Sequence, residues 1–217
     1  MRRPLPLCPP GPPRPAPYRI PPRTSGVVQL VMLQPTPFCN LDCRYCYLPN
    51  RSSRRVMPPE VLERVGHHVF RTPGLADRVT FLWHAGEPLA LPVPYYEAAF
   101  AALAGRNRHG HPVAHAVQTN GTLLNQGWAD FFAAHRVNIG VSLDGPAFLH
   151  DAQRLTRSGR GTDARVMEGV RVLQRNGIPF HVICVLSREH LRHPDAVFDF
   201  FAEHGIARVG FNVEEVE

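Results

Sequence analysis

Long apolar runs are the first feature that this sequence lacks. No segment of its 217 residues approaches the roughly 20 consecutive apolar residues needed to cross a bilayer. The first residues, Met1 to Cys8, carry positive charge but not the apolar core of about 7 to 15 residues that a signal peptide requires. Cys8 is therefore also a poor lipoprotein site. We expect a soluble, cytoplasmic protein with no membrane partner.

Cysteines and concentrated charge are scarce as well. Five cysteines, three of them clustered, fit a reducing compartment better than a disulfide framework. The formal net charge is +6, but the arginines are scattered and no basic run is interleaved with aromatic residues. We therefore expect no nucleic-acid partner. Cys184 lies in an apolar, strand-like run and is predicted to be an inert core residue.

Proline is abundant at one end of the chain. Residues 1–24 contain ten of the 23 prolines, which block helical and sheet hydrogen bonding and predict an extended or disordered leader. The remaining residues, 25–217, are ordinary in composition, since the whole chain is 44% hydrophobic and 19% charged. They are predicted to form one domain with a core of its own.

Short β-branched runs alternate with helical patterns along this domain, which indicates repeated βα units and a parallel sheet. The predicted strands are residues 27–33, 79–84, 114–118, 138–143, 180–186 and 208–213. The predicted helices are residues 57–70, 95–103, 126–135, 163–176 and 194–204. Six parallel strands joined by right-handed crossovers predict an α/β fold, a partial (β/α)6 TIM-like barrel.

Three cysteines follow the first predicted strand with a metal-ligand spacing. Cys39, Cys43 and Cys46 are separated by three and then two residues. A cubane 4Fe-4S cluster held by only three thiolates keeps one iron open for a substrate or cosubstrate. The alternative is a structural zinc site, which would want a fourth Cys or His at finger-like spacing. None is evident, and His67 falls within a helical pattern.

Polar or glycine-containing segments follow the later strands. They read WHAGEPL at 83–89, QTNGT at 118–122 and VSLDGP at 141–146, and the fifth strand contains VICVL at 182–186. In a parallel βα barrel such segments meet at the carboxyl end of the sheet, where the reactive groups gather. Each one alone predicts little more than a turn. His84 and Asp144 lie in these segments, but the sequence assigns neither a catalytic role.

The cysteine motif, with Tyr45 before its last cysteine, and the order of these segments resemble the radical S-adenosylmethionine (radical SAM) enzymes. The resemblance covers about residues 27–217 and implies that the three cysteines hold a 4Fe-4S cluster and that S-adenosylmethionine (SAM) is the second cofactor. It also implies the partial barrel of the radical SAM core.

The resemblance further assigns residues to SAM. Gly86 and Glu87 match the motif that holds its amino group, with Ala85 in place of a glycine. Ser142 and Arg154 match the residues at its methionyl carboxylate, a group that a guanidinium binds well.

The remaining assignments complete the implied SAM cavity. Gln118 and Asn120 match the segment that faces SAM and substrate, and Leu186 belongs to the strand that lies beside the adenine. Tyr45 is assigned as a further cofactor contact.

More narrowly, the phrases LQPTPFCN, WHAGEPL and GFNVEEVE resemble peptide-modifying radical SAM enzymes of the SPASM type. Within that group they most resemble the cyclophane-forming maturases of glycine-rich-repeat ribosomal peptides, with the sulfatase-maturing enzymes as neighbours. The resemblance implies a precursor peptide as substrate and an electron donor such as flavodoxin or ferredoxin. A 5′-deoxyadenosyl radical would abstract a side-chain hydrogen, which leads to a crosslink. The alternative is oxidation of a Cys or Ser to formylglycine.

SPASM enzymes carry a cysteine-rich domain beyond the barrel, whereas no cysteine follows Cys184 here. We therefore expect a truncated frame or a second polypeptide that supplies the SPASM segment. A third possibility is an inactive scaffold that binds a cluster without turnover.

Overall fold

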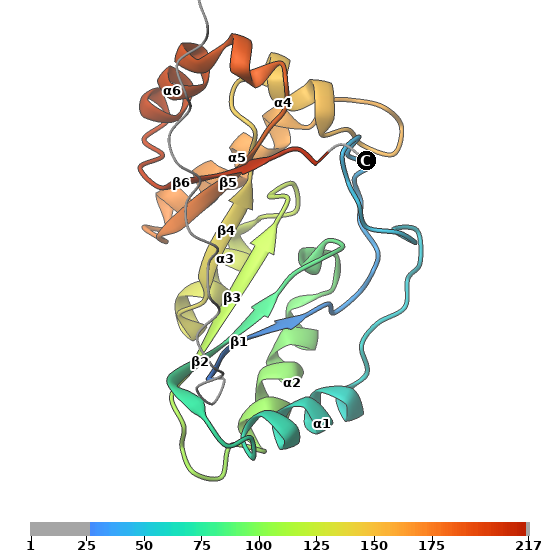
Figure 1. Cartoon of the computed structure of the whole chain (residues 1–217), viewed down its shortest axis with the longest axis vertical. Helices are drawn as coiled ribbons and strands as arrows, with labels where there is room; N and C mark the ends of the chain where they lie inside the picture. Colours follow the sequence, from blue (N-terminus) through green and yellow to red (C-terminus); the bar gives the residue numbers. More distant parts are fainter. Residues whose placement is uncertain (1–26, 216–217) are drawn as a thin grey trace, which may run out of the picture.

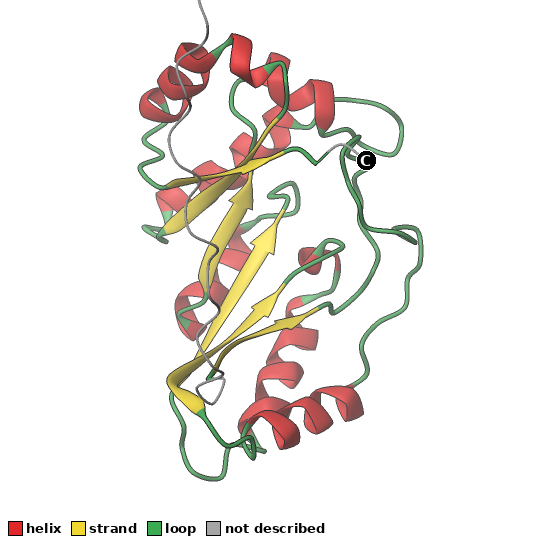
Figure 2. Ribbon diagram, in the orientation of Figure 1, coloured by secondary structure: helices red, strands yellow, loops and turns green. Residues whose placement is uncertain are grey.

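The chain folds around one parallel sheet. The computed structural model describes residues 27–215, so the predicted leader at 1–24 lies outside the described part. Its six strands lie in the sheet in chain order, β1-β2-β3-β4-β5-β6, and every neighbouring pair is parallel. The sheet curls into a half-barrel with helices packed on its outer side (Figures 1 and 2). This confirms the predicted partial (β/α)6 barrel.

The strands are β1 Val28–Leu33, β2 Leu75–Trp83, β3 Val113–Thr119, β4 Asn138–Ser142, β5 Phe180–Leu186 and β6 Val209–Val213. The helices are α1 Pro59–Val69, α2 Val93–Ala104, α3 Gln126–His135, α4 Ala147–Gln153, α5 Asp163–Arg175 and α6 Pro194–Glu203. Residues 27–215 also form two short 3-10 helices, η1 Pro88–Ala90 and η2 His190–Arg192. None of the helices in residues 27–215 combines the length and apolarity needed to cross a bilayer.

The core lies between the sheet and the helices. The clearest alternation is in β2, where Val79, Phe81 and Trp83 point into the core and are fully buried. Trp83 meets Tyr96 of α2 edge-on, with ring centroids 5.3 Å apart. Burying such large rings is the main favourable term of folding, so the helical side of the sheet holds the barrel together.

The other face of the sheet is concave and more polar. The side chain of Gln118 in β3 lies over Gly140 in β4. A Cβ added to Gly140 would lie 2.0 Å from Oε1 of Gln118. Next along β4, Ser142 accepts a hydrogen bond of 3.0 Å from Gln118 Nε2. The strand ends therefore present polar groups to the inside of the half-barrel.

Two elements differ from the predictions. Strand β2 begins at Leu75 instead of residue 79, because an irregular pairing brings Leu75 opposite Val28. Helix α4 was not predicted, since its seven residues are too few to show a periodic pattern. The other strands and helices lie within two residues of the predicted bounds.

Candidate active site

The three clustered cysteines lie in a long loop between β1 and α1. We call residues 38–52 the cysteine loop. Its base is closed by Cys39 N, which donates to the carbonyl of Arg51 at 3.0 Å. Cys39, Cys43 and Cys46 are all half-buried, whereas Cys184 is fully buried in β5. The prediction of Cys184 as a core residue is confirmed, and the role of the other three cysteines as cluster ligands stays a prediction.

The environment of the thiols suits a metal cluster. Burial raises the pKa of Cys39 to about 12 and also raises that of Cys43, so these thiols stay neutral until a cation pairs with them. Asn120 Nδ2 lies 3.8 Å from Cys39 Sγ and Leu41 N 3.5 Å, and both can donate to a thiolate. In residues 27–215, no three His, Cys, Asp or Glu side chains converge as ligands of a single ion. Thiolates that each bind a different iron of a cluster need no such convergence.

The turn after β2 contacts the cysteine loop through its backbone. Ala85 and Gly86 both have left-handed backbones, with φ of 70° and 66°. A Cβ on Gly86 would lie 2.3 Å from the carbonyl oxygen of Thr36, so only glycine fits there. Glu87 N donates to the carbonyl of Phe38 at 2.7 Å. The turn therefore lies directly behind the first cysteine.

The side chain of Glu87 joins this turn to the end of β3. It is fully buried and accepts hydrogen bonds from Leu89 N, Thr119 Oγ1 and Asn120 N at 2.9, 2.7 and 2.8 Å. Burial raises the pKa of Glu87 to about 7, against the lowering effect of these three donors. The carboxylate thus organises the strand ends, and its contact with SAM stays a prediction.

Asn120 connects the end of β3 to the cysteine loop. Its Nδ2 donates to Asn40 Oδ1 at 2.8 Å, and Asn40 Nδ2 donates in turn to Thr122 Oγ1 at 2.8 Å. Thr122 donates back to Asn120 Oδ1 through its own hydroxyl. The QTNGT segment is therefore part of the wall that supports the first cysteine, beyond its role as a turn.

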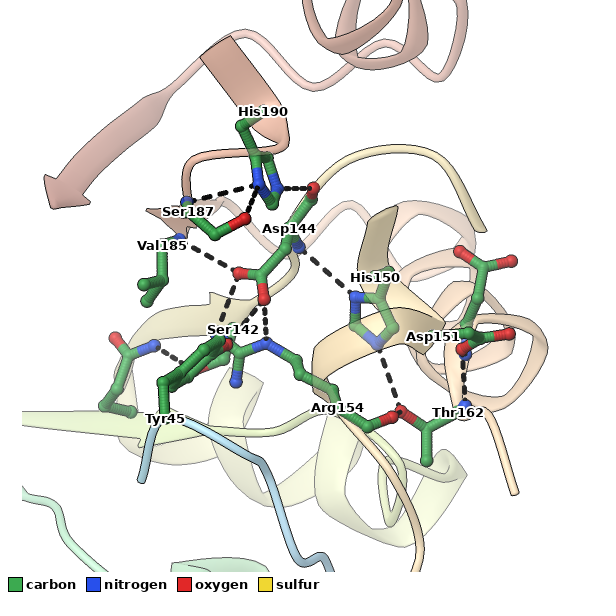
Figure 3. Close-up of polar contacts among 12 residues, drawn as sticks. Tyr45, Ser142, Asp144, His150, Asp151, Arg154, Thr162, Val185, Ser187 and His190 are labelled. Atoms are coloured by element: carbon green, nitrogen blue, oxygen red, sulfur yellow. Dashed lines mark hydrogen bonds and ion pairs between the residues drawn. The ribbon is translucent and has the colours of Figure 1, made fainter. Parts of the chain in front are cut away.

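A buried ion pair lies at the end of β4. Arg154 donates through Nε and Nη2 to the two carboxylate oxygens of Asp144, at 2.8 and 3.0 Å (Figure 3). Burial alone would raise the pKa of Asp144, but the Arg154 guanidinium and further hydrogen bonds hold it below its usual range. One edge of the guanidinium is thus occupied by Asp144, and Nη1 has no hydrogen bond within the described residues.

Tyr45 reaches this ion pair from the cysteine loop. Its hydroxyl donates to Asp144 Oδ2 at 2.5 Å, and the Arg154 guanidinium carbon lies 5.4 Å from the centre of its ring. Asp144 Oδ1 also accepts from Val185 N of β5 at 2.9 Å. Sequence reasoning gave Asp144 no role; its place directly after a parallel strand was the only signal.

A cavity of about 760 Å³ opens beside these residues. It is lined by residues 44–47 of the cysteine loop, by Val185 and by residues 211–215. Tyr45 and Cys46 thus lie at a space large enough for a cofactor. Leu186 does not line it, because its side chain packs against the core, so its predicted adenine contact is not brought to this cavity.

Comparisons with known proteins agree with this geometry. A family model described as "Radical SAM superfamily" matches residues 33–201. An uncharacterized protein of Synechocystis is 45% identical over 196 residues, covering 88% of this chain and 49% of its own length. A serine-type anaerobic sulfatase-maturating enzyme of Bacteroides thetaiotaomicron is 32% identical, covering 80% of this chain and 43% of its own length.

Among solved structures, native anSMEcpe with bound AdoMet and Cp18Cys peptide superposes with a TM-score of 0.79 at 25% identity. The match covers 87% of this chain and 51% of that chain. The chain thus spans about half the length of the curated relatives and of the solved structure that it matches.

Proposed function

Because the chain belongs to the radical SAM superfamily, whose cofactors are a 4Fe-4S cluster and SAM, we propose that it is the radical-generating part of a peptide maturase. The observation that carries the proposal is the loop of three half-buried cysteines at the carboxyl end of a parallel half-barrel. When bound, the cluster and SAM supply a 5′-deoxyadenosyl radical that abstracts hydrogen from an unactivated carbon.

The residues of this chain bind and orient the cofactors in this proposal. Cys39, Cys43 and Cys46, which are all half-buried, would hold three irons of the cluster. The turn at Gly86 and Glu87 supports the SAM amino group, since it lies against the first cysteine.

Side chains of β4 and of the segment after it bind the methionyl carboxylate of SAM, which is on the same carbon atom as the amino group. Ser142 and Nη1 of Arg154 bind the methionyl carboxylate, and Gln118 positions Ser142 through its hydrogen bond. Asn120 lies next to Cys39 and faces the same cofactor. Tyr45 and Val185 of β5, which both line the cavity, border the adenosyl group.

The proposed substrate is a ribosomal precursor peptide, with a flavodoxin or ferredoxin as electron donor. Its modification is a cyclophane-type crosslink, in which two C–H bonds are replaced by one C–C bond. One hydrogen leaves with the deoxyadenosyl group, and the second leaves as a proton while its electron passes to an oxidised iron-sulfur cluster of a SPASM segment, which this proposal requires as acceptor. Formylglycine formation on a Cys or Ser is the second candidate, favoured by the sulfatase-maturating relatives.

The radical step is tested by anaerobic reconstitution with iron and sulfide, followed by dithionite and SAM. We expect 5′-deoxyadenosine in the wild type and its loss in Cys43→Ala. Cys184→Ala is the matched control, because this cysteine is buried in β5 and should not affect cleavage. A cluster-free protein that holds zinc would overturn the proposal. A cluster-loaded protein without deoxyadenosine would identify a scaffold.

The two peptide chemistries are separated by mass spectrometry. The loaded enzyme is incubated with a glycine-rich precursor peptide and, separately, with a sulfatase-type peptide that contains the target Cys or Ser. Loss of two hydrogens from the first peptide, with a crosslink between two residues in its fragment spectrum, supports the maturase. An aldehyde in the second peptide supports formylglycine formation instead.

A further inference from the structure

We propose that the connection between β4 and α5, residues 143–162, is a clamp that holds the cysteine loop in its ligand-binding shape. Its positioning residues are Asp144, which holds the middle of the loop, and Arg157, which holds its base. The inference rests on the proposed function for the identity of the group that the loop binds, but the clamp itself consists of contacts within the metal-free chain.

Asp144 fixes the middle of the loop through Tyr45. This tyrosine lies between Cys43 and Cys46, so the position of its ring constrains both thiols. Asp144 is fully buried and accepts four hydrogen bonds: two from Arg154, one from Val185 N and one from Tyr45. A carboxylate held by this many donors is a rigid acceptor, and a charged hydrogen bond to it is stronger than a neutral one.

Arg157 closes the base of the loop. Its Nε and Nη2 both donate to the carbonyl of Cys39, at 3.0 and 2.8 Å. Its Nη2 also donates to the carbonyl of Arg51, and its Nη1 donates to Ser52 Oγ at 3.0 Å. One planar guanidinium therefore joins the residue where the chain enters the loop to the residues where it leaves.

Between these two points the backbones are paired. Asp42 N donates to the carbonyl of Leu155 at 2.8 Å, and Arg44 N donates to the carbonyl of Gln153 at 2.9 Å. Leu41 and Thr156 form an isolated antiparallel bridge. The contact therefore runs along the cysteine loop from residue 39 to residue 45.

The connection is itself rigid, as a clamp must be. His150 accepts from Asp144 N through Nδ1 at 3.2 Å and donates through Nε2 to Thr162 Oγ1 at 3.0 Å. His150 thus links the two ends of the connection, and Thr162 Oγ1 also donates to the carbonyl of Arg154 in its middle at 2.8 Å. From the other side, His190 Nε2 donates to the carbonyl of Asp144 at 2.8 Å (Figure 3).

Alkylation of the metal-free protein, followed residue by residue in the mass spectrometer, tests the clamp. The test variants are Tyr45→Phe, which removes one hydroxyl, and Arg157→Gln. Their matched controls are Tyr95→Phe, which removes a hydroxyl bonded to Met57 O, and Arg160→Gln in the same connection. Arg157→Lys keeps the charge without the planar fork and is expected to behave like Arg157→Gln.

We expect the loop cysteines to react about fivefold faster in Tyr45→Phe than in Tyr95→Phe, the size of effect that one lost hydrogen bond gives. The increase in Arg157→Gln over Arg160→Gln should be at least as large, because Arg157 donates several hydrogen bonds. Cys184 serves as an internal reporter, because it is fully buried and reacts only when the barrel opens. Its rate should stay unchanged. The clamp would be overturned if the loop cysteines were alkylated at the same rate in test and control variants. It would also be overturned if they were alkylated faster only when Cys184 was alkylated faster too.

The reconstituted protein gives a second measurement. The rate of iron release to a chelator should rise in Tyr45→Phe and Arg157→Gln but not in their controls, and unchanged rates would count against the clamp. If the wild type takes up no cluster at all, the proposed function fails. The alkylation rates of the metal-free chain then still decide whether the clamp exists.

Discussion

Several polar side chains near the cysteine loop are buried together with their hydrogen-bonding or ion-pair partners, and these partners determine which side chains are charged. Arg154 is the clearest case. The resemblance assigns it to the methionyl carboxylate of SAM, and the carboxylate that it meets within the chain is that of Asp144. Removing one member of such a pair leaves a buried charge without compensation, so the pair constrains the site whether or not SAM is bound.

His150 makes folding stability sensitive to mild acid. Burial, its main perturbation, lowers its pKa to about 4, while the unfolded chain has a histidine pKa of about 6.5. The unfolded state therefore binds more protons between these values, so stability is full above about pH 6.5 and falls as the pH drops toward 4. Between pH 7 and 5 we expect this side chain alone to cost about 2 kcal/mol.

Urea unfolding at pH 7 and pH 5 measures this cost. His150→Gln can still accept the hydrogen bond from Asp144 N and should reduce the difference between the two pH values. His68→Gln changes an exposed histidine on α1 and should leave the difference unchanged. A His150→Gln variant with the full wild-type difference would show that other groups cause the acid sensitivity.

At the scale of single elements, proline and glycine residues in the sequence located most helix ends. Helices α5 and α6 are followed by Gly177 and Gly205, which have φ of 62° and 65° and end the helices as expected. Helix α1 begins directly after Pro58 with Pro59 in its first turn. Helix α2 begins two residues before its predicted start, because Pro92 and Pro94 stand at its beginning and obscure the helical pattern.

The turn between β2 and η1 depends on Gly86. A Cβ at this position would approach the backbone oxygens of Thr36 and Phe38, at 2.3 and 2.8 Å, and the substituted residue would also have to keep a left-handed φ. We expect Gly86→Ala to destabilise the fold by about 3 kcal/mol, from the clash and the backbone strain together. Differential scanning calorimetry or urea unfolding measures the loss.

Gly110→Ala is the matched control for this turn. Gly110 has a similar φ of 63°, but a Cβ there would meet nothing within 4 Å. It should therefore show only the backbone cost, about 1 to 2 kcal/mol. Equal losses in the two variants would mean that the close approach of the turn to the cysteine loop contributes nothing.

At the scale of the whole molecule, the half-barrel brings distant segments of the chain to one end. Tyr45 and Asp144 are 99 residues apart in sequence, and Asn40 and Asn120 are 80 apart, yet both pairs are hydrogen-bonded. The cysteine loop has neither helix nor strand of its own. Its shape therefore depends on contacts with the rest of the barrel, and a cluster bound to three of its residues should stabilise the native state as a whole.

Removal of the cluster tests this dependence. A ligand that binds only the native state stabilises it by mass action, by about 2.7 kcal/mol when present at a hundredfold excess over its dissociation constant. We expect the urea midpoint of the reconstituted protein to fall after anaerobic treatment with a chelator. In Cys43→Ser the midpoint should be the same before and after treatment. A wild-type midpoint that does not change would show that the loop binds no stabilising cluster.

The sequence by itself determined the βα order, the parallel half-barrel and the candidate cysteine ligands. Hydrophobic periodicity, turn residues and ligand spacing are local properties, and each strand run carries its own signal. Only the tertiary structure decided which partners the buried polar groups take. Asp144 with Tyr45 and Arg157 with Cys39 are pairings between segments about a hundred residues apart, and no local pattern specifies them. They form because the curled sheet brings these groups together, where a buried polar atom must find a partner.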